Sequence, residues 1–335
     1  MRKTKRMTTK RKLFIHIGMH KTGTSSIQYA MHRNHDILLQ NGYLYPLTGR
    51  HPLAYVQHDL FFRALASAPP AGGVFAIAET VDPEVLFRAL LQEISLTNCN
   101  SVILSAENFW LLQSSEVSRL GEWLADFEIL PIIFVRRFSD FADSLHLTRV
   151  RIDPDYAKMF AARQDFYADY ADLDLVRCIN DWAQLSTSGQ VALCSYDNLN
   201  NDSLRTFLRV VGLGAVTFRE AGMRYNESQS IISEAIRTAC GRHGVSEEHS
   251  NWLTKQIGRL NFRGKHTLIP PAERAKLDEV YLAQVNKLLK SKKVKPIEVE
   301  RWQLTREEPL VHLDGLLSIM FEIGRALAED NPLKA

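Results

Sequence analysis

A loop near the amino terminus holds the residues best suited to bind a phosphate. The apolar, β-branched run at residues 13–17 predicts a strand, and the loop at 18–23 (GMHKTG) follows it with one lysine, Lys21. A helical pattern then begins at residues 24–26 (TSS). A strand, a tight loop and a helix start direct backbone N–H groups and a helix dipole at a bound anion, so this stretch predicts a phosphate site.

The spacing of this loop departs from that of a nucleotide-triphosphate site. Gly18 and Gly23 match the first part of G-x-x-x-x-G-K-[ST], but Thr24 stands at the lysine position and Lys21 lies inside the loop. We therefore expect a relative of the phosphate loop that binds a different phosphorylated ligand. His20 adjoins Lys21 and is a candidate base.

Glu107 follows the next predicted strand, at residues 102–104. Because ligands bind at the carboxyl ends of parallel strands, we expect Glu107 to lie close to the loop at Lys21. The residue position allows two interpretations. Glu107 is either a first-turn acid favoured by a helix dipole or a general base in the cleft.

Two arginines, Arg136 and Arg137, follow the predicted strand at 131–135. Charged groups at the end of a buried strand are costly unless they meet anions. Ser144 would lie one to two turns into the helix that follows, on the face that looks back toward Arg136. A bidentate guanidinium and a hydroxyl could hold one phosphate. The alternative is that the nearby aspartates pair with the arginines.

Three further regions carry polar side chains that suit a site. Tyr196 follows the strand predicted at 191–194 and could pack against a base or simply in the core. A glycine-centred basic loop around Arg263 and Lys265 could close over an anion. His51 and His58 lie in an aromatic-rich segment that could line a pocket mouth, with ordinary surface packing as the alternative.

The order of elements predicts an α/β fold: a three-layer, P-loop-like domain with a central, mainly parallel sheet flanked by helices. We expect one domain over residues 13–330 with a helical C-terminal part. Apolar runs predict the strands 13–17, 102–104, 131–135 and 191–194. Periodicity predicts helices at 25–40, 83–94, from about 139, 173–185, 204–211, 228–242, 247–257, 272–289 and 310–327, with a solvated lysine-rich helix end at 287–295.

The basic charge of the chain lies in its first residues. The formal net charge is +3, but residues 1–12 hold seven Lys or Arg and no acid, which leaves 34 basic against 38 acidic residues. The body therefore does not resemble a nucleic-acid binder. We expect residues 1–12 to be a disordered leader, with attraction to an anionic membrane surface as the alternative.

Targeting and metal-binding patterns are missing from the sequence. It shows no secretory signal and no run long enough to span a membrane, so we expect a cytoplasmic protein, peripheral at the inner membrane if the basic tail binds lipid. The four cysteines are far apart and form no C-x-x-C pair, which predicts a reduced compartment, no zinc site and no disulfide framework.

Taken together, the motifs resemble those of the PAPS-dependent sulfotransferases, where PAPS is 3′-phosphoadenosine-5′-phosphosulfate. The first loop of that family reads K-[ST]-G-T-[ST], which residues 21–25 (KTGTS) fit. Its 3′-phosphate site has an arginine, an aspartate four positions on and a serine eight on, as in Arg136, Asp140 and Ser144. The flanking sequence is more similar to bacterial carbohydrate-type members than to the cytosolic enzymes for phenols and steroids.

Later segments extend the resemblance. The family's tyrosine-acidic-x-leucine segment is matched at residues 196–199 (YDNL), with Trp182 upstream. In the heparan-type enzymes a glutamate follows the second strand, as Glu107 does here. The histidine motif of the cytosolic enzymes has no match. The basic loop at 263–265 (RGK) only approximates the family's arginine-lysine-glycine element.

The resemblance implies sulfuryl transfer from PAPS to a hydroxyl of a saccharide or glycolipid, without a metal. Lys21 would reach the oxygen that bridges sulfur and the 5′-phosphate, and Glu107 would take the acceptor proton, with His20 as the rival base. Arg136 and Ser144 would bind the 3′-phosphate. The full set of cofactor-binding residues implied is Lys21, Thr22, Gly23, Thr24, Ser25, Ser26, Arg136, Ser144, Tyr196, Arg263 and Lys265.

Two other functions remain open from the sequence. A small-molecule kinase would share the fold, but it should carry lysine at the position of Thr24 and use Mg²⁺. A non-catalytic module would bind the nucleotide and transfer nothing. Neither the acceptor nor the oligomeric state follows from the sequence.

Overall fold

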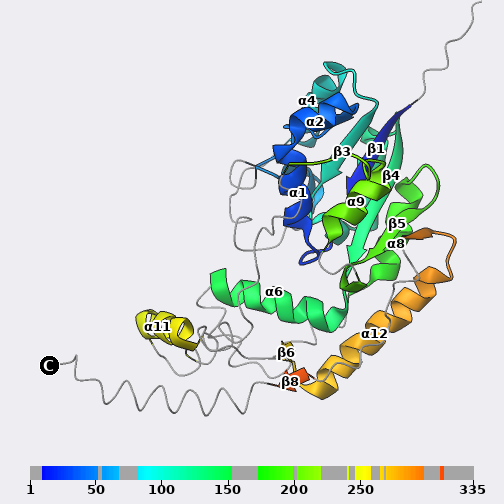
Figure 1. Ribbon diagram of the computed structural model, residues 1–335. Helices are drawn as coiled ribbons and strands as arrows, with labels where there is room; N and C mark the ends of the chain where they lie inside the picture. Colours follow the sequence, from blue (N-terminus) through cyan, green and yellow to red (C-terminus); the bar gives the residue numbers. More distant parts are fainter. Residues whose placement is uncertain are drawn as a thin grey trace, which may run out of the picture. The chain divides into compact units, whose positions relative to one another are not determined.

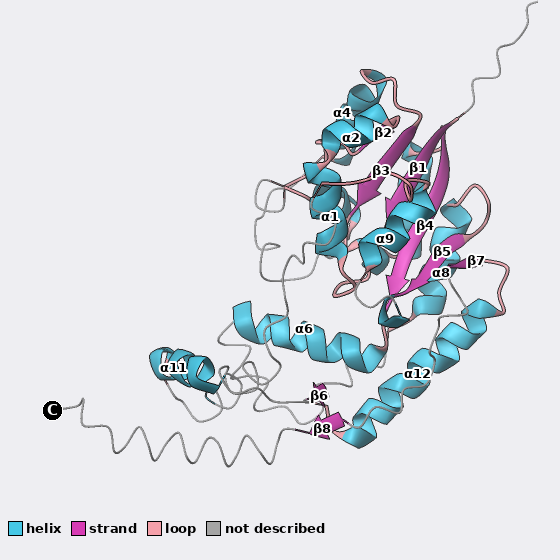
Figure 2. Cartoon of the chain, in the orientation of Figure 1, coloured by secondary structure: helices cyan, strands magenta, loops and turns pink. Residues whose placement is uncertain are grey.

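The computed structural model of the chain describes residues 10–51, 55–67, 82–152, 173–198, 202–219, 240, 246–257, 265–267, 269–297 and 310–312 (Figures 1 and 2). The chain divides into two compact units, and each is described by itself. The sheet unit comprises Met1–Arg136, Asp174–Tyr225 and Gln284–Gln303, and the helical unit comprises Arg137–Leu173, Asn226–Ala283 and Leu304–Ala335.

A six-stranded parallel sheet forms the centre of the sheet unit, in the order β2-β3-β1-β4-β5-β7. In register, Ile15 of the central strand pairs with Leu104 on one side and Pro131 on the other. This topology confirms the predicted α/β class with a mainly parallel sheet. The strands are β1 (Arg11–His16), β2 (Tyr43–Leu44), β3 (Ser101–Ser105), β4 (Phe127–Val135), β5 (Val191–Ser195) and β7 (Val294–Ile297).

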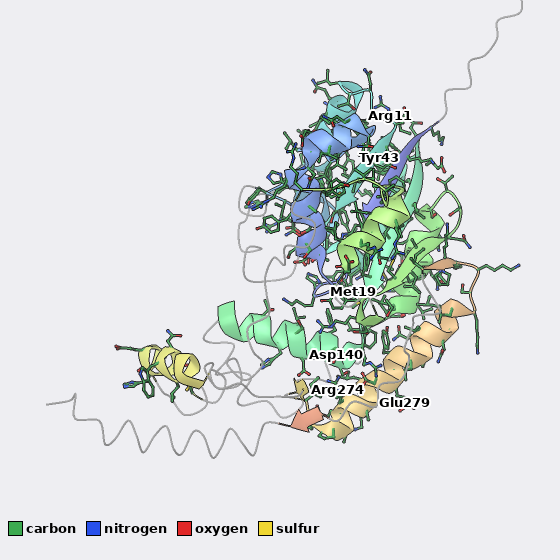
Figure 3. All side chains as sticks on the ribbon, in the orientation of Figure 1. Arg11, Met19, Tyr43, Asp140, Arg274 and Glu279 are labelled. Atoms are coloured by element: carbon green, nitrogen blue, oxygen red, sulfur yellow. The ribbon has the colours of Figure 1, made fainter. Side chains whose placement is uncertain are left out.

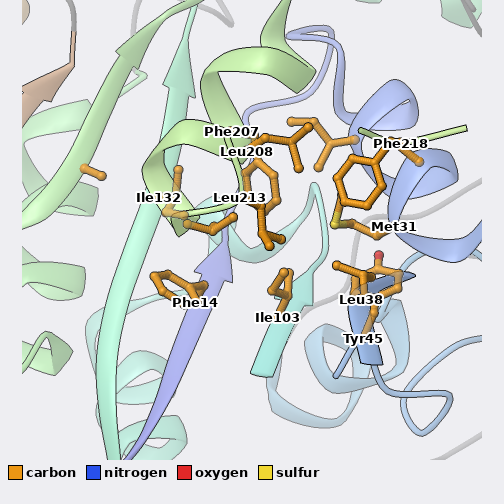
Figure 4. Packing of buried hydrophobic residues seen from close by; sticks show 14 of the residues in the cluster. Phe14, Met31, Leu38, Tyr45, Ile103, Ile132, Phe207, Leu208, Leu213 and Phe218 are labelled. Carbon is orange, nitrogen blue, oxygen red and sulfur yellow. The ribbon is translucent and has the colours of Figure 1, made fainter. Parts of the chain in front are cut away.

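Helices flank this sheet, as Figure 2 shows. Alternate apolar residues of β1, β3 and β4 pack against α1 and α9 in one buried cluster that includes Phe14, Ile103, Phe134 and Phe207 (Figure 4). The helix α8 packs against β4, β5 and α5. The helices of the sheet unit are α1 (Thr24–Arg33), α2 (His35–Gln40), α3 (Asp59–Leu65), α4 (Pro83–Ser95), α5 (Ser114–Trp123), α8 (Leu175–Leu185) and α9 (Ser203–Val211), with short 3₁₀ turns η2 (Phe109–Leu111) and η4 (Tyr196–Asn198).

The helix predicted over residues 25–40 is broken at Asn34. The Asn34 side chain donates to the Ala30 carbonyl at 2.8 Å and accepts the Arg219 backbone N–H at 2.8 Å. The amide therefore ends α1 and ties the break to a segment 185 residues away.

Two other expectations for the C-terminal part are wrong. The lysine-rich stretch at 287–295 is not a helix end throughout, because α12 (Pro271–Leu289) stops and the chain enters β7, which pairs with β5 at the sheet edge. Residues 310–312 form strand β8 (Leu310–His312), paired in parallel with β6 (Lys265–Thr267), where a helix was predicted. The rest of that predicted helix, and most of the helix predicted at 228–242, lie outside the described residues.

The helical unit contains α6 (Phe138–Ile152), α11 (Glu247–Ile257) and the first part of α12, with β6 and β8. Arg274 of α12 forms ion pairs with Asp140 and Asp143 of α6, the second at 3.2 Å (Figure 3 labels Asp140 and Arg274). Burial alone would lower the pKa of Arg274, but the two carboxylates raise it. These aspartates therefore bind an arginine of α12, and Arg137 instead contacts Asp278 at 3.4 Å.

Candidate functional site

The loop that follows β1 continues the pairing with β4 before it turns. The Met19 N–H donates to the Phe134 carbonyl at 3.0 Å, and the Phe134 N–H donates to the Gly18 carbonyl at 2.8 Å. The chain then reverses through Lys21, which has a φ of 62°. A non-glycine residue in this left-handed region costs roughly 1–2 kcal/mol, so the surrounding loop holds Lys21 in a conformation it would not choose alone.

Two glycines let this loop approach neighbouring segments closely. A Cβ at Gly18 would lie 2.6 Å from the Glu107 carbonyl oxygen, and one at Gly23 would lie 2.1 Å from the Ser203 hydroxyl. Gly23 is also the N-cap of α1, with a φ of 80° and no side chain to cap the first turn. Since the first turn holds no acidic residue either, its amide groups and the helix dipole favour an external anion.

The structure places Glu107 beside this helix start. The Thr24 hydroxyl donates to Glu107 Oε2 at 2.8 Å, and Thr24 is buried while Glu107 is half-buried. A carboxylate therefore lies at the N-terminal turn of the helix that follows the loop. Thr22 and Thr24 were expected to bind the cofactor. Instead, the Thr24 hydroxyl donates to Glu107, and the Thr22 hydroxyl donates to the Met19 carbonyl at 2.6 Å. Both hydroxyls therefore stabilise the loop itself.

His20 is held at both ring nitrogens. The Trp110 indole N–H donates to His20 Nδ1 at 3.0 Å, so the other ring nitrogen carries the proton and donates to the Asn108 side-chain oxygen at 2.7 Å. Asn108 in turn donates to Asp59 at 2.7 Å, and Asp59 accepts from Arg63 at 2.9 Å. With one nitrogen accepting and the other donating, His20 offers no lone pair to a substrate proton in this arrangement.

Arg136 lies against the loop from the end of β4. Its Nη1 donates to the Lys21 carbonyl at 3.0 Å, and its guanidinium carbon lies 5.2 Å from the centroid of the Tyr196 ring. The Arg136 Nε is buried and has no hydrogen-bond partner among the described residues. A buried guanidinium N–H without an acceptor is unusual in a folded protein, and a bound anion would satisfy it.

Other expected site residues lie in the helical unit or outside the described residues. Ser144 lies half-buried in α6 of the helical unit, where its carbonyl accepts from Thr148 at 3.0 Å. Because Arg136 and Ser144 belong to different units, their shared phosphate site stays a prediction. Arg263 lies outside the described residues, and Lys265 begins β6 of the helical unit.

The two histidines proposed for a pocket mouth are both buried. His58 accepts the Ser105 backbone N–H at 3.0 Å and donates to the Pro46 carbonyl at 2.9 Å. Burial, and then the nearby Arg50, lower its pKa to about 3. His58 is therefore a neutral residue that joins β3 to the segment after β2.

The sequence did not predict the residues that hold His20 in place. Asn108 and Trp110 lie within three positions of Glu107 in the chain, which was the one signal available for them. Asp59 and Arg63 show only the i,i+4 spacing of an ordinary helical ion pair. Ser203 contacts Gly23 from the start of α9, and no pattern in the sequence indicates that contact.

Among the described residues, no group of three or more His, Cys, Asp or Glu side chains could hold a metal ion. No helix in the same ranges has the length and apolarity to cross a bilayer.

Comparison with known proteins gives a distant structural likeness. No protein-family model and no curated protein matches the sequence. A solved structure, the crystal structure of a sulfotransferase from Alicyclobacillus acidocaldarius, aligns with a TM-score of 0.40 and 14% sequence identity. The alignment covers 70% of this chain and 97% of that one. A similarity of this size does not identify a function. A function has to be inferred from the site residues themselves.

Proposed function

We propose that the protein is a PAPS-dependent sulfotransferase, which moves a sulfuryl group from PAPS to a hydroxyl of a saccharide or glycolipid. The observation that carries this proposal is the hydrogen bond between Thr24 and Glu107. Thr24 stands at the position of the nucleotide-triphosphate lysine, and its hydroxyl holds a carboxylate beside the start of α1. A carboxylate at this position can accept the proton of an acceptor hydroxyl, which sulfuryl transfer must remove.

The donor's 5′-phosphate would be held by the start of α1. The backbone N–H groups of residues 23–25 and the hydroxyls of Ser25 and Ser26 would supply the donors, with the helix dipole behind them. The Ser26 N–H itself donates to the Gly23 carbonyl at 3.1 Å, and Thr22 and Thr24 keep their hydroxyls within the loop. Lys21 would meet the oxygen that bridges sulfur and the 5′-phosphate.

The proposed step is an in-line displacement at sulfur. The acceptor oxygen forms a bond to sulfur while the bond from sulfur to the bridging oxygen breaks, and the acceptor proton passes to Glu107. Adenosine 3′,5′-bisphosphate leaves with the electron pair on its 5′-phosphate, where Lys21 and the α1 amides stabilise the charge. A positioned base typically contributes about 10²–10⁴-fold to the rate.

Glu107 suits the base role better than His20. Both nitrogens of His20 are engaged by Trp110 and Asn108, whereas the Thr24 hydroxyl contacts one oxygen of the Glu107 carboxylate. His20 would then act by holding the loop backbone next to Lys21.

The 3′-phosphate would be bound by Arg136 of the sheet unit. The buried Arg136 Nε without an acceptor among the described residues supports an anion at this position. Tyr196, which lies against Arg136, would border the nucleotide. A 3′-phosphate site would let the protein reject ATP.

An acceptor screen tests the transferase directly. Incubation with ³⁵S-labelled PAPS and capsular, lipid-linked and lipopolysaccharide fragments should label at least one class in wild type, and none with the Lys21→Ala variant. If no class is labelled while adenosine bisphosphate binds, the protein is a nucleotide-binding module. Phosphate transfer from ATP would establish a kinase instead.

A further inference from the structure

The solvent face of α1 leads away from the proposed transfer site. Ser25 lies in the first turn, Tyr29 one turn further on, and His32 and Arg33 in the last turn. At 1.5 Å per residue, Tyr29 lies about 6 Å along the helix axis from Ser25. The helix carries no acidic residue. A long acceptor whose reacting hydroxyl is at the loop could therefore extend along this face.

An aromatic group lies on this face. The Tyr55 ring lies 6.3 Å from the Tyr29 ring and 5.2 Å from the His32 ring, both nearly perpendicular to it. Tyr55 is 48% exposed, and Tyr29 and His32 are half-buried. Tyrosine and histidine offer both an apolar ring face and a polar group, and such side chains are enriched where proteins bind polar ligands.

Arg50 adds a positive charge beneath these rings. Its guanidinium donates to the carbonyls of Pro46 and Tyr45 at 2.7 and 2.8 Å and lies 2.8 Å from His32 Nδ1. These three partners are neutral and orient the guanidinium. Burial lowers the pKa of Arg50, and the nearby Glu93 carboxylate acts in the opposite direction. Burial first, and then Arg50, lower the pKa of His32, so His32 stays neutral near pH 7 and accepts from Arg50.

Contacts among the described residues hold Arg50 and the segment at Tyr55. The Tyr45 hydroxyl donates to the Val56 carbonyl at 2.6 Å, and His58 donates to the Pro46 carbonyl at 2.9 Å. The Arg50 guanidinium also lies 4.5 Å from the Tyr45 ring centroid. These contacts position the Arg50 guanidinium and the backbone next to Tyr55.

We infer that Tyr29, His32, Arg33, Arg50 and Tyr55 form a subsite for an acidic saccharide, with the rings against sugar faces and the arginines facing a carboxylate. This acceptor subsite rests on the proposed sulfotransferase function. The subsite selects an acceptor that already bears negative charge, such as a uronate-containing chain. Charge attraction of this kind weakens with ionic strength.

Calorimetry with two matched hexasaccharides tests the subsite, in the presence of adenosine 3′,5′-bisphosphate. The probes are an oligogalacturonate hexamer and maltohexaose, which are both α-1,4-linked. They differ in carboxylate content and in the configuration at C4, and the salt dependence of binding separates the effect of charge from that of configuration. Wild type should bind the galacturonate more tightly, and high salt should remove the difference. Arg33→Gln and Tyr55→Ala should each weaken galacturonate binding about tenfold, while Tyr55→Phe should keep it.

Arg88→Gln is the control, since Arg88 is also exposed and lies on α4. It should leave both affinities unchanged. Equal binding of the two sugars, no binding of the galacturonate, or wild-type affinity in Arg33→Gln and Tyr55→Ala would each overturn the subsite. If the nucleotide still binds in those cases, the sulfotransferase proposal stands without it. If the galacturonate binds as expected but the nucleotide does not, the subsite stands and the transferase proposal fails.

Discussion

The Thr24 hydroxyl donates to the Glu107 carboxylate at 2.8 Å, which links the first residue of α1 to the segment after β3. The two residues are 83 positions apart in the chain. A threonine at this position therefore anchors a carboxylate, where a nucleotide-triphosphate loop would have a lysine on the phosphates. The same loop scaffold can in this way serve a different transfer chemistry.

Lys21→Ala should reduce sulfuryl transfer by about 10²–10³-fold, because one charge-stabilising group at the leaving oxygen is lost. The left-handed backbone at Lys21 is equally strained for alanine, so the melting temperature should hardly change. Turnover of labelled PAPS and thermal unfolding measure the two quantities. Unchanged turnover in this variant would remove Lys21 from the mechanism.

Glu107→Gln should lower turnover by about 10²–10⁴-fold and keep nucleotide affinity. Glutamine keeps an oxygen that can accept from Thr24, so the loop should stay in place. The comparison variant is His20→Gln, which should lower the free energy of unfolding more than it lowers turnover. If His20→Gln loses turnover and Glu107→Gln does not, the base is His20.

Thr24→Val should lower turnover about tenfold and keep nucleotide affinity, because the Glu107 carboxylate loses the hydrogen bond that positions it. Thr24→Ser, which keeps a hydroxyl, should retain the wild-type turnover. Turnover of labelled PAPS measures both variants. Equal turnover in wild type and Thr24→Val would show that this hydrogen bond does not position the base.

Arg136→Ala should weaken adenosine 3′,5′-bisphosphate binding by about tenfold or more, through loss of a charge-assisted contact. Adenosine 5′-monophosphate should be affected less, since it lacks the 3′-phosphate. Arg205, on α9, gives a matched control as Arg205→Ala. An equal loss of affinity for both nucleotides would show that Arg136 acts by holding the loop, through its hydrogen bond to the Lys21 carbonyl, and does not bind the 3′-phosphate.

Acid should destabilise the sheet unit through two buried histidines. Burial lowers the pKa of His16 and of His58 to about 3, from an ordinary value of 6.5. The unfolded chain therefore binds more protons than the folded one between these values, so the free energy of unfolding falls as pH drops from 6.5 toward 3. Each histidine should contribute roughly 2 kcal/mol of loss at pH 5.

Urea unfolding at pH 7 and pH 5 measures this loss. His58→Gln should reduce the difference between the two pH values, and His249→Gln, at an exposed position of α11, should not. The same pH difference in wild type and His58→Gln would assign the acid sensitivity to other groups.

The central strands were predictable because each is a short, buried, β-branched run, which few other elements resemble. The edge strands were not. β2 has only two residues. β7 carries Lys295 and Pro296, a composition typical of a solvated segment, and only its pairing with β5 makes it a strand. The break at Asn34 depends on Arg219, which lies far away in the chain.

The candidate site was predictable to a similar extent. Residue types and their order along the chain predicted that Glu107 lies near the loop at Lys21, because parallel strands end at one edge of a sheet. The chain of hydrogen bonds from Trp110 through His20 to Asn108 and Asp59 joins three separate segments. Such networks follow from tertiary contacts that no local pattern encodes.

Nucleotide binding by isothermal titration calorimetry tests the sulfotransferase proposal without an acceptor. Wild type should bind adenosine 3′,5′-bisphosphate without Mg²⁺ and more tightly than ATP–Mg²⁺, and Arg136→Ala should lose this preference. Tighter binding of ATP–Mg²⁺, with no measurable binding of the bisphosphate, would contradict it.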